Sequence, residues 1–202
     1  MLIKNIILLF SMLILMCCNY KKVGKEISED TNILTNYQDT LFKDLSKTVG
    51  ILDSVFALSL KEKGYKKIPE KIFYMENLEY LNLSMNKIDS IPNEIKKLKK
   101  LKVLIISYSN LTYISPNFCM LDSLKEVNFL YNKLHEIPEC ISSLSHLESL
   151  NCNGNYIQKF PFNIDSMKRL KYFLVESEDE SFFSKEQKEY LTRLKQHCKV
   201  SF

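Results

Sequence analysis

The chain has 202 residues, 46% of them hydrophobic and 26% charged, an ordinary composition for one folded domain with appendages. A net charge of +4 is too small to indicate nucleic-acid binding. The six cysteines form no C-x-x-C pair and have no histidine at metal-ligand spacing. The sequence therefore predicts no metal site and no cofactor.

Residues 1–17 are predicted to be a signal peptide. The run Ile6–Met16 follows the positive Lys4, is apolar apart from one serine, and is too short for a comfortable transmembrane helix. The segment ends Leu-Met-Cys-Cys, which resembles the lipobox of bacterial lipoproteins, where the signal is cut before a cysteine that then carries lipid. Met16 departs from that pattern, which leaves Cys17 or Cys18 open. Cys18 fits better because cleavage would follow a small residue, and the alternatives are a plain secretory signal or an uncleaved anchor.

Residues 18–36 carry many charges and few bulky apolar side chains, which is typical of a flexible tether. Lys21, Lys22 and Lys25 could contact anionic headgroups, but a solvated linker is the simpler interpretation.

Residues 37–54 are predicted to form an N-terminal cap. Between Tyr37 and Val49 the apolar residues recur at helical spacing, Asp39 or Thr40 could be the N-cap, and Gly50 would end the helix. Such a helix would shield the open end of the domain that follows. The apolar positions are Leu41, Phe42, Leu45 and Val49.

A 23-residue unit recurs four times between Leu78 and Arg169 without insertion or deletion. A degenerate copy precedes it from Val55, in which Lys63 replaces the asparagine and Gly64 is expected to make the turn. In the second full copy Ser109 stands at the asparagine position and Pro116 comes one place late, so we expect a slight irregularity there. The first full copy reads Leu78-x-x-Leu81-x-Leu83-x-x-Asn86-x-Ile88, then Ile91-Pro92, Ile95 and Leu98.

The spacing of the unit has a simple physical meaning. Leu-x-Leu places two side chains on one face of a short strand, and the asparagine amide can bond backbone groups that a bend leaves unpaired. One copy cannot bury its apolar edge alone, so stacked neighbours must complete the core. Residues 55–178 are therefore predicted to be a right-handed α/β leucine-rich repeat solenoid with a concave parallel β-sheet.

The unit resembles the 23-residue class of leucine-rich repeats found in Ras-suppressor-like, plant intracellular and many bacterial proteins. Internalins are a related comparison with typically shorter repeats. The resemblance covers about residues 55–178 and is highly specific for the fold. It implies no particular active site, because members of this class mostly bind other proteins. With the lipobox-like N-terminus, the chain resembles a bacterial leucine-rich repeat lipoprotein.

Residues 179–202 are predicted to be a C-terminal cap. Ser184-x-x-Gln187 matches a capping box, and the apolar residues that follow lie on one helical face. Residues 199–202 could add a last strand. The apolar face consists of Tyr190, Leu191, Leu194 and Cys198.

The residues between the inward leucines point to the opposite face of the sheet, which we expect to be open to a partner. Apolar and aromatic side chains gather there in the middle copies within a polar rim. That mixture is typical of a protein-binding patch, although a few exposed apolar side chains are normal on any sheet. The predicted binding residues are Tyr80, Val103, Ile105, Tyr108, Glu126, Asn128, Leu130, Tyr131, Asn151 and Tyr172.

Other clusters give weaker signals. A lysine run at the junction of the first two full copies could bind an anionic polymer or membrane, but is more often a solvated rim. The acidic run Glu176–Glu180 could hold calcium loosely or mark the turn into the last helix. A bridge between Cys119 and Cys140 is possible but not required, and Cys152 takes an inward position. The lysines are Lys96, Lys97, Lys99, Lys100 and Lys102.

Catalysis finds little support. His135, His146 and His197 fall at unrelated repeat offsets, and none has a recurring serine or cysteine beside it. No glycine-rich phosphate loop or H-E-x-x-H motif is present. We therefore expect a protein that is not an enzyme.

The patterns together predict a monomeric protein-binding module, held at the bacterial cell envelope by lipid on Cys18. Its partner would be an unidentified protein on the concave face, with no nucleic acid. The alternatives are an envelope spacer without a dedicated ligand, or an intracellular regulatory scaffold if the N-terminus is not a signal.

Overall fold

The computed structural model describes residues 37, 40–159, 161, 163–176, 183–196 and 198–201. The predicted signal peptide, the predicted tether with Cys18, Asp39, His197 and residues 177–180 lie outside the described residues. Within the described part of the chain, no helix has the length and apolar character needed to cross a membrane.

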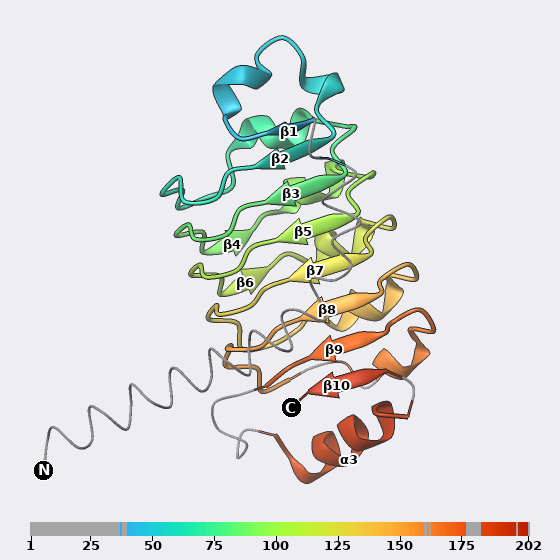
Figure 1. The fold of residues 1–202 in the computed structure, drawn as a ribbon. Helices are drawn as coiled ribbons and strands as arrows, with labels where there is room; N and C mark the ends of the chain where they lie inside the picture. The colour runs from blue at the N-terminus through green and yellow to red at the C-terminus, as the bar shows by residue number, and fades with distance from the viewer. Residues whose placement is uncertain are drawn as a thin grey trace, which may run out of the picture. The chain divides into compact units, whose positions relative to one another are not determined.

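One parallel sheet runs through residues 40–201, and its strands are stacked one above another in Figure 1. Neighbouring strands pair in parallel, with Leu81 opposite Leu104 and Leu104 opposite Val127. Each step between full copies is therefore 23 residues, as the repeat requires. In order, the strands are β1 (Leu41–Phe42), β2 (Ala57–Ser59), β3 (Tyr80–Asn82), β5 (Val103–Ile105), β7 (Glu126–Asn128), β8 (Ser149–Asn151), β9 (Tyr172–Leu174) and β10 (Lys199–Ser201).

Short 3-10 helices form the return path of each copy on the side away from the sheet (Figure 1). A small second sheet pairs β4 (Ser90–Ile91) with β6 (Tyr113–Ile114). This arrangement confirms the predicted repeat solenoid. The helices are η3 (Glu70–Tyr74), η4 (Asn93–Lys97), η5 (Pro116–Met120), η6 (Glu139–Ser143) and η7 (Ile164–Ser166).

The core is the column of inward side chains between the sheet and these helices. Leu81, Leu104 and Val127 are each 0% exposed, as are Ile95 and Phe118 from the helical side. Each such side chain stabilises the fold by roughly 1.5–3 kcal/mol through burial. Since no copy can bury these groups alone, the stack folds through contacts between neighbouring copies.

The asparagines that occupy the same position of the repeat link their copies to the ones before them. The Asn132 Oδ1 accepts a hydrogen bond from the Leu111 amide at 2.9 Å, and its Nδ2 donates to the carbonyls of Ile106 and Phe129. Asn86, two copies earlier, and Asn155, one copy later, make the same contacts. We call this series the asparagine ladder.

The asparagine ladder is interrupted at Ser109. Its hydroxyl is buried without a hydrogen-bond partner among the described residues. By the offsets of the other copies, an asparagine at this position would accept from the Ile88 amide and donate to the carbonyls of Leu83 and Ile106. The expected irregularity of the second copy is thus a gap in side-chain bonding, while β5 keeps its pairing on both sides.

Pro116 causes no distortion. In the first and third copies Pro92 and Pro138 are the N-caps of η4 and η6, whereas Ser115 is the N-cap of η5. The Ser115 Oγ accepts from the Asn117 amide at 3.1 Å, and Pro116 occupies the first turn, where no amide proton is needed.

The predicted helix over Tyr37–Val49 is wrong. Leu41 and Phe42 form β1, which pairs with β2, and only η1 (Leu45–Thr48) is helical before the short η2 (Leu52–Ser54). The N-cap of η1 is Asp44, whose carboxylate accepts from the Ser46 amide, and not Asp39 or Thr40. A strand is favoured here because it satisfies the unpaired backbone groups of the sheet edge, and a short apolar run fits either period.

The described part of the C-terminal segment contains the predicted helix and last strand. Helix α3 (Lys185–Leu194) begins with the Ser184–Gln187 capping box, and β10 pairs with β9 after it. The predicted apolar face is buried, with Tyr190 and Leu194 each 2% exposed.

Of the four cysteines among the described residues, two are bridged and two are free. Cys119 in η5 and Cys140 in η6 form a disulfide, which resolves the alternative that the sequence left open. Cys152 and Cys198 are buried free thiols. Cys152 takes the inward position expected of it, and burial raises its pKa to about 12, so it remains a packing thiol and not a nucleophile.

Ser109→Asn should complete the asparagine ladder. We expect the free energy of unfolding to rise by about 1–2 kcal/mol, because an unpaired buried hydroxyl is replaced by a group with three backbone partners. Denaturant unfolding of the full chain measures the change. The reverse substitution, Asn132→Ser, should lower the free energy of unfolding by about 1–3 kcal/mol. A Ser109→Asn variant no more stable than the parent would show that the missing side-chain bonds at position 109 do not destabilise the fold.

Leu104→Asp and Ile105→Asp should differ sharply, although the residues are adjacent. Leu104 is fully buried in the stack, and Ile105 lies half-buried on the other face. We expect Leu104→Asp to lower the free energy of unfolding by roughly 4 kcal/mol or more, because it buries an unpaired carboxylate, and Ile105→Asp to lower it by less than about half of that. Thermal melting followed by circular dichroism checks this, and equal losses would contradict the register of β5.

Candidate protein-binding face

The predicted columns of the sheet are present in the expected register. Tyr80, Val103 and Glu126 lie opposite one another on β3, β5 and β7, and Ile105, Asn128 and Asn151 lie opposite one another on β5, β7 and β8. The structure therefore brings these predicted residues together on one face, with Tyr172 opposite Ser149 at its far side.

The prediction that this whole face is open is wrong. Val103 is 1% exposed, Leu130 3%, Tyr80 2% and Asn151 3%. Part of this burial comes from the sheet itself. Strands lie only about 4.8 Å apart, so larger side chains of adjacent copies cover a valine or leucine between them. Ile105, Glu126, Asn128 and Tyr172 are half-buried.

The asparagines on this face hold the ends of the strands. The Oδ1 atoms of Asn128 and Asn151 accept hydrogen bonds from the backbone amides two residues later, those of Leu130 at 3.0 Å and Asn153 at 3.1 Å. Asn82 does the same for Ser84. Their side-chain carbonyls are thus committed to the fold, a role that a binding interpretation of the sequence alone had missed.

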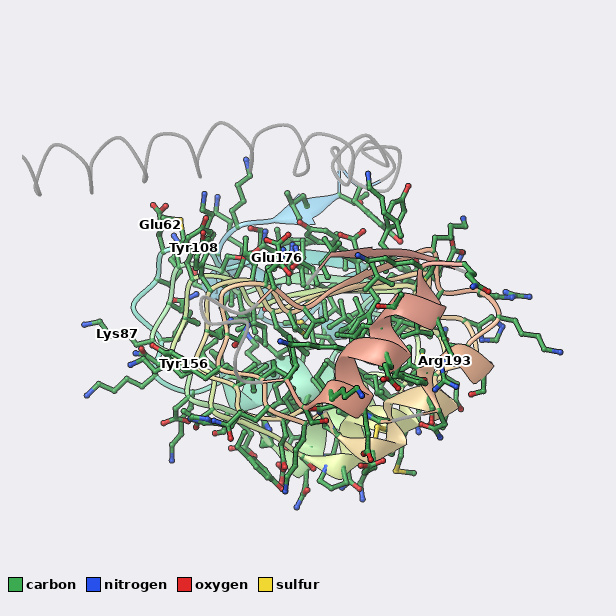
Figure 2. The ribbon with its side chains drawn as sticks, turned by 90° about the horizontal axis from the view of Figure 1, so that it is seen from below. Glu62, Lys87, Tyr108, Tyr156, Glu176 and Arg193 are labelled. Atoms are coloured by element: carbon green, nitrogen blue, oxygen red, sulfur yellow. A yellow bond between two sulfur atoms is a disulfide. The ribbon has the colours of Figure 1, made fainter. Side chains whose placement is uncertain are left out.

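Three exposed apolar side chains stand beyond the strands, each just before residue 86, 109 or 132 of the ladder. Met85 is 45% exposed, Tyr108 47% and Tyr131 38%. All three have a positive φ, of 58°, 53° and 50°, as does Glu62 one copy earlier at 59°. We call Met85, Tyr108 and Tyr131 the ridge; seen along the stack, Tyr108 projects from the same corner as Glu62 (Figure 2).

The backbone of the ridge is costly for bulky side chains. A left-handed conformation costs a non-glycine residue roughly 1–2 kcal/mol, and in the fourth full copy this position is Gly154, with φ 65°. Unfavourable backbone held at several consecutive copies favours a functional interpretation. Met85 was absent from the predicted binding residues; the spacing of 23 residues from Tyr108 is the signal that would have included it.

The two ridge tyrosines pack on each other and on the glycine below them. The rings of Tyr108 and Tyr131 have centroids 5.0 Å apart at an interplanar angle of 33°. The Tyr131 ring also covers Gly154 so closely that a Cβ there would overlap its Cδ1. The Tyr131 ring therefore requires a glycine at position 154, and glycine also takes the positive φ there without strain.

The electrostatics of the face are mild. Burial raises the pKa of Tyr80, whose hydroxyl accepts a hydrogen bond from the Asn82 side-chain Nδ2 at 3.3 Å. Desolvation also raises the pKa of Glu176, which accepts from Asn153 Nδ2 at 3.3 Å. A partner would meet hydroxyls, amides and rings more than fixed charge.

The histidines take ordinary surface positions. His135 stacks on Tyr156 with centroids 5.7 Å apart, and His146 Nδ1 lies 2.9 Å from the Asp122 carbonyl oxygen. His146 Nδ1 also lies 3.3 Å from the Oγ of its chain neighbour Ser145, at an exposed position. No group of three metal-ligating side chains gathers within the described ranges.

Three solved structures are similar to the chain, which spans less than two thirds of the length of each. A leucine-rich repeat protein of Leptospira interrogans is 20% identical with a TM-score of 0.39, covering 66% of this chain and 57% of that one. The leucine-rich repeat ectodomain of the membrane receptor kinase GASSHO1/SCHENGEN3 of Arabidopsis thaliana, in complex with CASPARIAN STRIP INTEGRITY FACTOR 2, is 26% identical with a TM-score of 0.54, covering 62% and 16%. A TDR receptor is 24% identical with a TM-score of 0.49, covering 68% and 33%.

No curated protein matches the chain. The family model described as Leucine rich repeat matches residues 56–111 and 99–157, which together span half of the chain. The asparagine ladder, the parallel sheet and the 23-residue register lie within that span. The chain belongs to the leucine-rich repeat family.

Proposed function

We propose that this chain is a non-catalytic protein-binding module of the bacterial cell envelope, anchored by lipid on Cys18. Leucine-rich repeat domains are generally protein-interaction modules. The partner contacts the ridge and the half-buried residues beside it, Ile105 and Asn128. The chain acts as a monomer and takes no nucleic acid.

The observation that carries this proposal is the ridge. The stacked tyrosines present an aromatic edge that loses little side-chain entropy on binding, with a methionine beside them, and such side chains are enriched where proteins bind one another. The sheet spaces them one copy apart, so a partner meets an ordered row. Keeping bulky residues in a left-handed backbone is difficult to explain by stability alone.

The disulfide supports the location. Bonds such as Cys119–Cys140 form and persist mainly in oxidising compartments, outside the bacterial cytoplasm. An exported chain with a lipobox-like N-terminus fits that condition, whereas an intracellular scaffold does not.

The Arabidopsis ectodomain offers a parallel for the mode of binding. That leucine-rich repeat ectodomain was solved in complex with CASPARIAN STRIP INTEGRITY FACTOR 2. By analogy, the repeat surface here is a platform for a protein partner, although the two chains share only a small part of the receptor's length.

Tyr108→Asn with Tyr131→Asn should abolish partner binding while preserving the fold. Asparagine tolerates a positive φ better than tyrosine, so the melting temperature should stay unchanged or rise slightly. With the full chain as bait in envelope extracts, we expect capture of its specific partner to fall by at least about tenfold, as is typical when a central aromatic anchor is lost.

The matched control is Tyr113→Asn with Tyr156→Asn. These tyrosines are 55% and 47% exposed, and neither belongs to the ridge. The control should capture the partner as the parent does. Equal capture by both double variants would remove the ridge from the interface and, with it, the main support for the proposal.

The mass of the N-terminal peptide of the natively produced protein tests the anchor. We expect a peptide that begins at Cys18 and carries added acyl mass. An unmodified peptide beginning at Met1 would contradict the envelope location and would leave the binding face unaffected.

A further inference from the structure

An open hollow of about 610 Å³ lies on the helical side of the stack, where η3 and η4 end. Three lysines line it, together with Tyr74 and Asn77. Glu76 is the one carboxylate among the lining residues. We call this the lysine hollow; its lysines are Lys97, Lys99 and Lys100.

Each of the three ammonium groups is held in place by a neutral partner. Lys97 Nζ lies 4.8 Å from the centroid of the Tyr74 ring. Lys99 Nζ donates to the Met120 carbonyl at 2.9 Å, and Lys100 Nζ donates to Asn77 Oδ1 at 2.6 Å. Asn77 is itself oriented, because its Nδ2 donates to the Asp53 carbonyl at 2.7 Å.

These partners fix the positions of the ammonium groups without cancelling their charge. Lys102, the next lysine in the run, is different, since it pairs with Glu79 at 2.8 Å. Across the described part of the chain, none of the ion pairs within 4.0 Å involves the three lysines of the hollow. The nearby Glu70 accepts a hydrogen bond from the Tyr74 hydroxyl at 3.2 Å. The hollow therefore keeps an excess of positive charge.

The repeat itself does not require lysine at these positions. The same offsets hold Tyr74, Glu76 and Asn77 in the copy before, and Met120, Asp122 and Ser123 in the copy after. The copy after that has Ser143, Ser145 and His146. Lysines at all three offsets are thus a property of this one copy. The preceding copy supplies the Tyr74 ring and the Asn77 side-chain amide that position two of them, and the following copy supplies the Met120 carbonyl that positions the third.

We propose that the lysine hollow binds a phosphate group of multiple negative charge. Lysine binds phosphate as a point charge, and three fixed ammonium groups around an open space suit several anionic oxygens at once. The hollow lies on the helical side and the ridge beyond the strands, so this anion site is independent of the protein-binding face. The phosphate could be soluble or belong to a lipid headgroup, and the test separates these sources.

The experiment uses the full chain with Cys17→Ser and Cys18→Ser, which removes the proposed lipid. Calorimetry with sodium tripolyphosphate at low salt measures the soluble source, and co-sedimentation with phosphatidylglycerol or phosphatidylcholine vesicles measures the headgroup. The test variant is Lys97→Gln, Lys99→Gln and Lys100→Gln together. The control removes equal charge elsewhere through Lys87→Gln, Lys125→Gln and Lys133→Gln.

We expect the test variant to lose at least about tenfold in affinity, and the control to lose less than about threefold. Replacing the same three lysines by arginine should retain binding, which separates loss of charge from loss of fold. Binding to phosphatidylglycerol vesicles alone, with the same ranking of variants, assigns the phosphate to a headgroup. The proposal would be overturned by equal losses of affinity in the test and control variants, or if neither tripolyphosphate nor phosphatidylglycerol vesicles bind the chain.

Discussion

The structure depends on one interaction that crosses from each copy to the one before it. In the asparagine ladder a single amide accepts a hydrogen bond from the preceding copy and donates to carbonyls of both copies. It replaces the bonds that the backbone loses when it leaves the strand, so the turn can be buried. Because the bonds join neighbouring copies, they fix the 23-residue register, and the register places both the inward leucines and the outer columns.

The ridge follows from the same constraint. To bring its asparagine inward, the chain turns through a left-handed residue just before it, and that residue must project outward. Glycine would satisfy the backbone at every copy, as Gly154 does in one. The chain instead has methionine and two tyrosines there, and the tyrosine stack rests on that glycine. The left-handed residue that the turn of each copy requires therefore places a row of exposed side chains, two of them aromatic, beside the strands.

The solenoid could be predicted from the sequence because the same apolar pattern recurs every 23 residues, so that each inward position is supported by its equivalents in the other copies. It also predicted the capping box of α3 and the turn at Gly64, whose φ is 75°. It failed for Leu41 and Phe42, where a short apolar run outside the repeat fits either a helix or a strand, and pairing with β2 decided. For Val103 and Leu130 it predicted the face but not the burial, which depends on the sizes of neighbouring side chains. The lysine hollow could not be derived, because it requires the positions of Tyr74 and Asn77 relative to the next copy.

The disulfide has a mechanical consequence. Cys119 and Cys140 are 21 residues apart, in η5 and η6 of adjacent copies. If the proposed anchor holds the N-terminus while a partner pulls on the repeats, the chain comes under tension, and an unbridged solenoid then lengthens by unravelling copy by copy. The bridge withholds the enclosed residues from that extension, roughly 70 Å of contour at about 3.5 Å per residue. The segment between the two cysteines, which includes Tyr131 of the ridge, is therefore kept from extending under force.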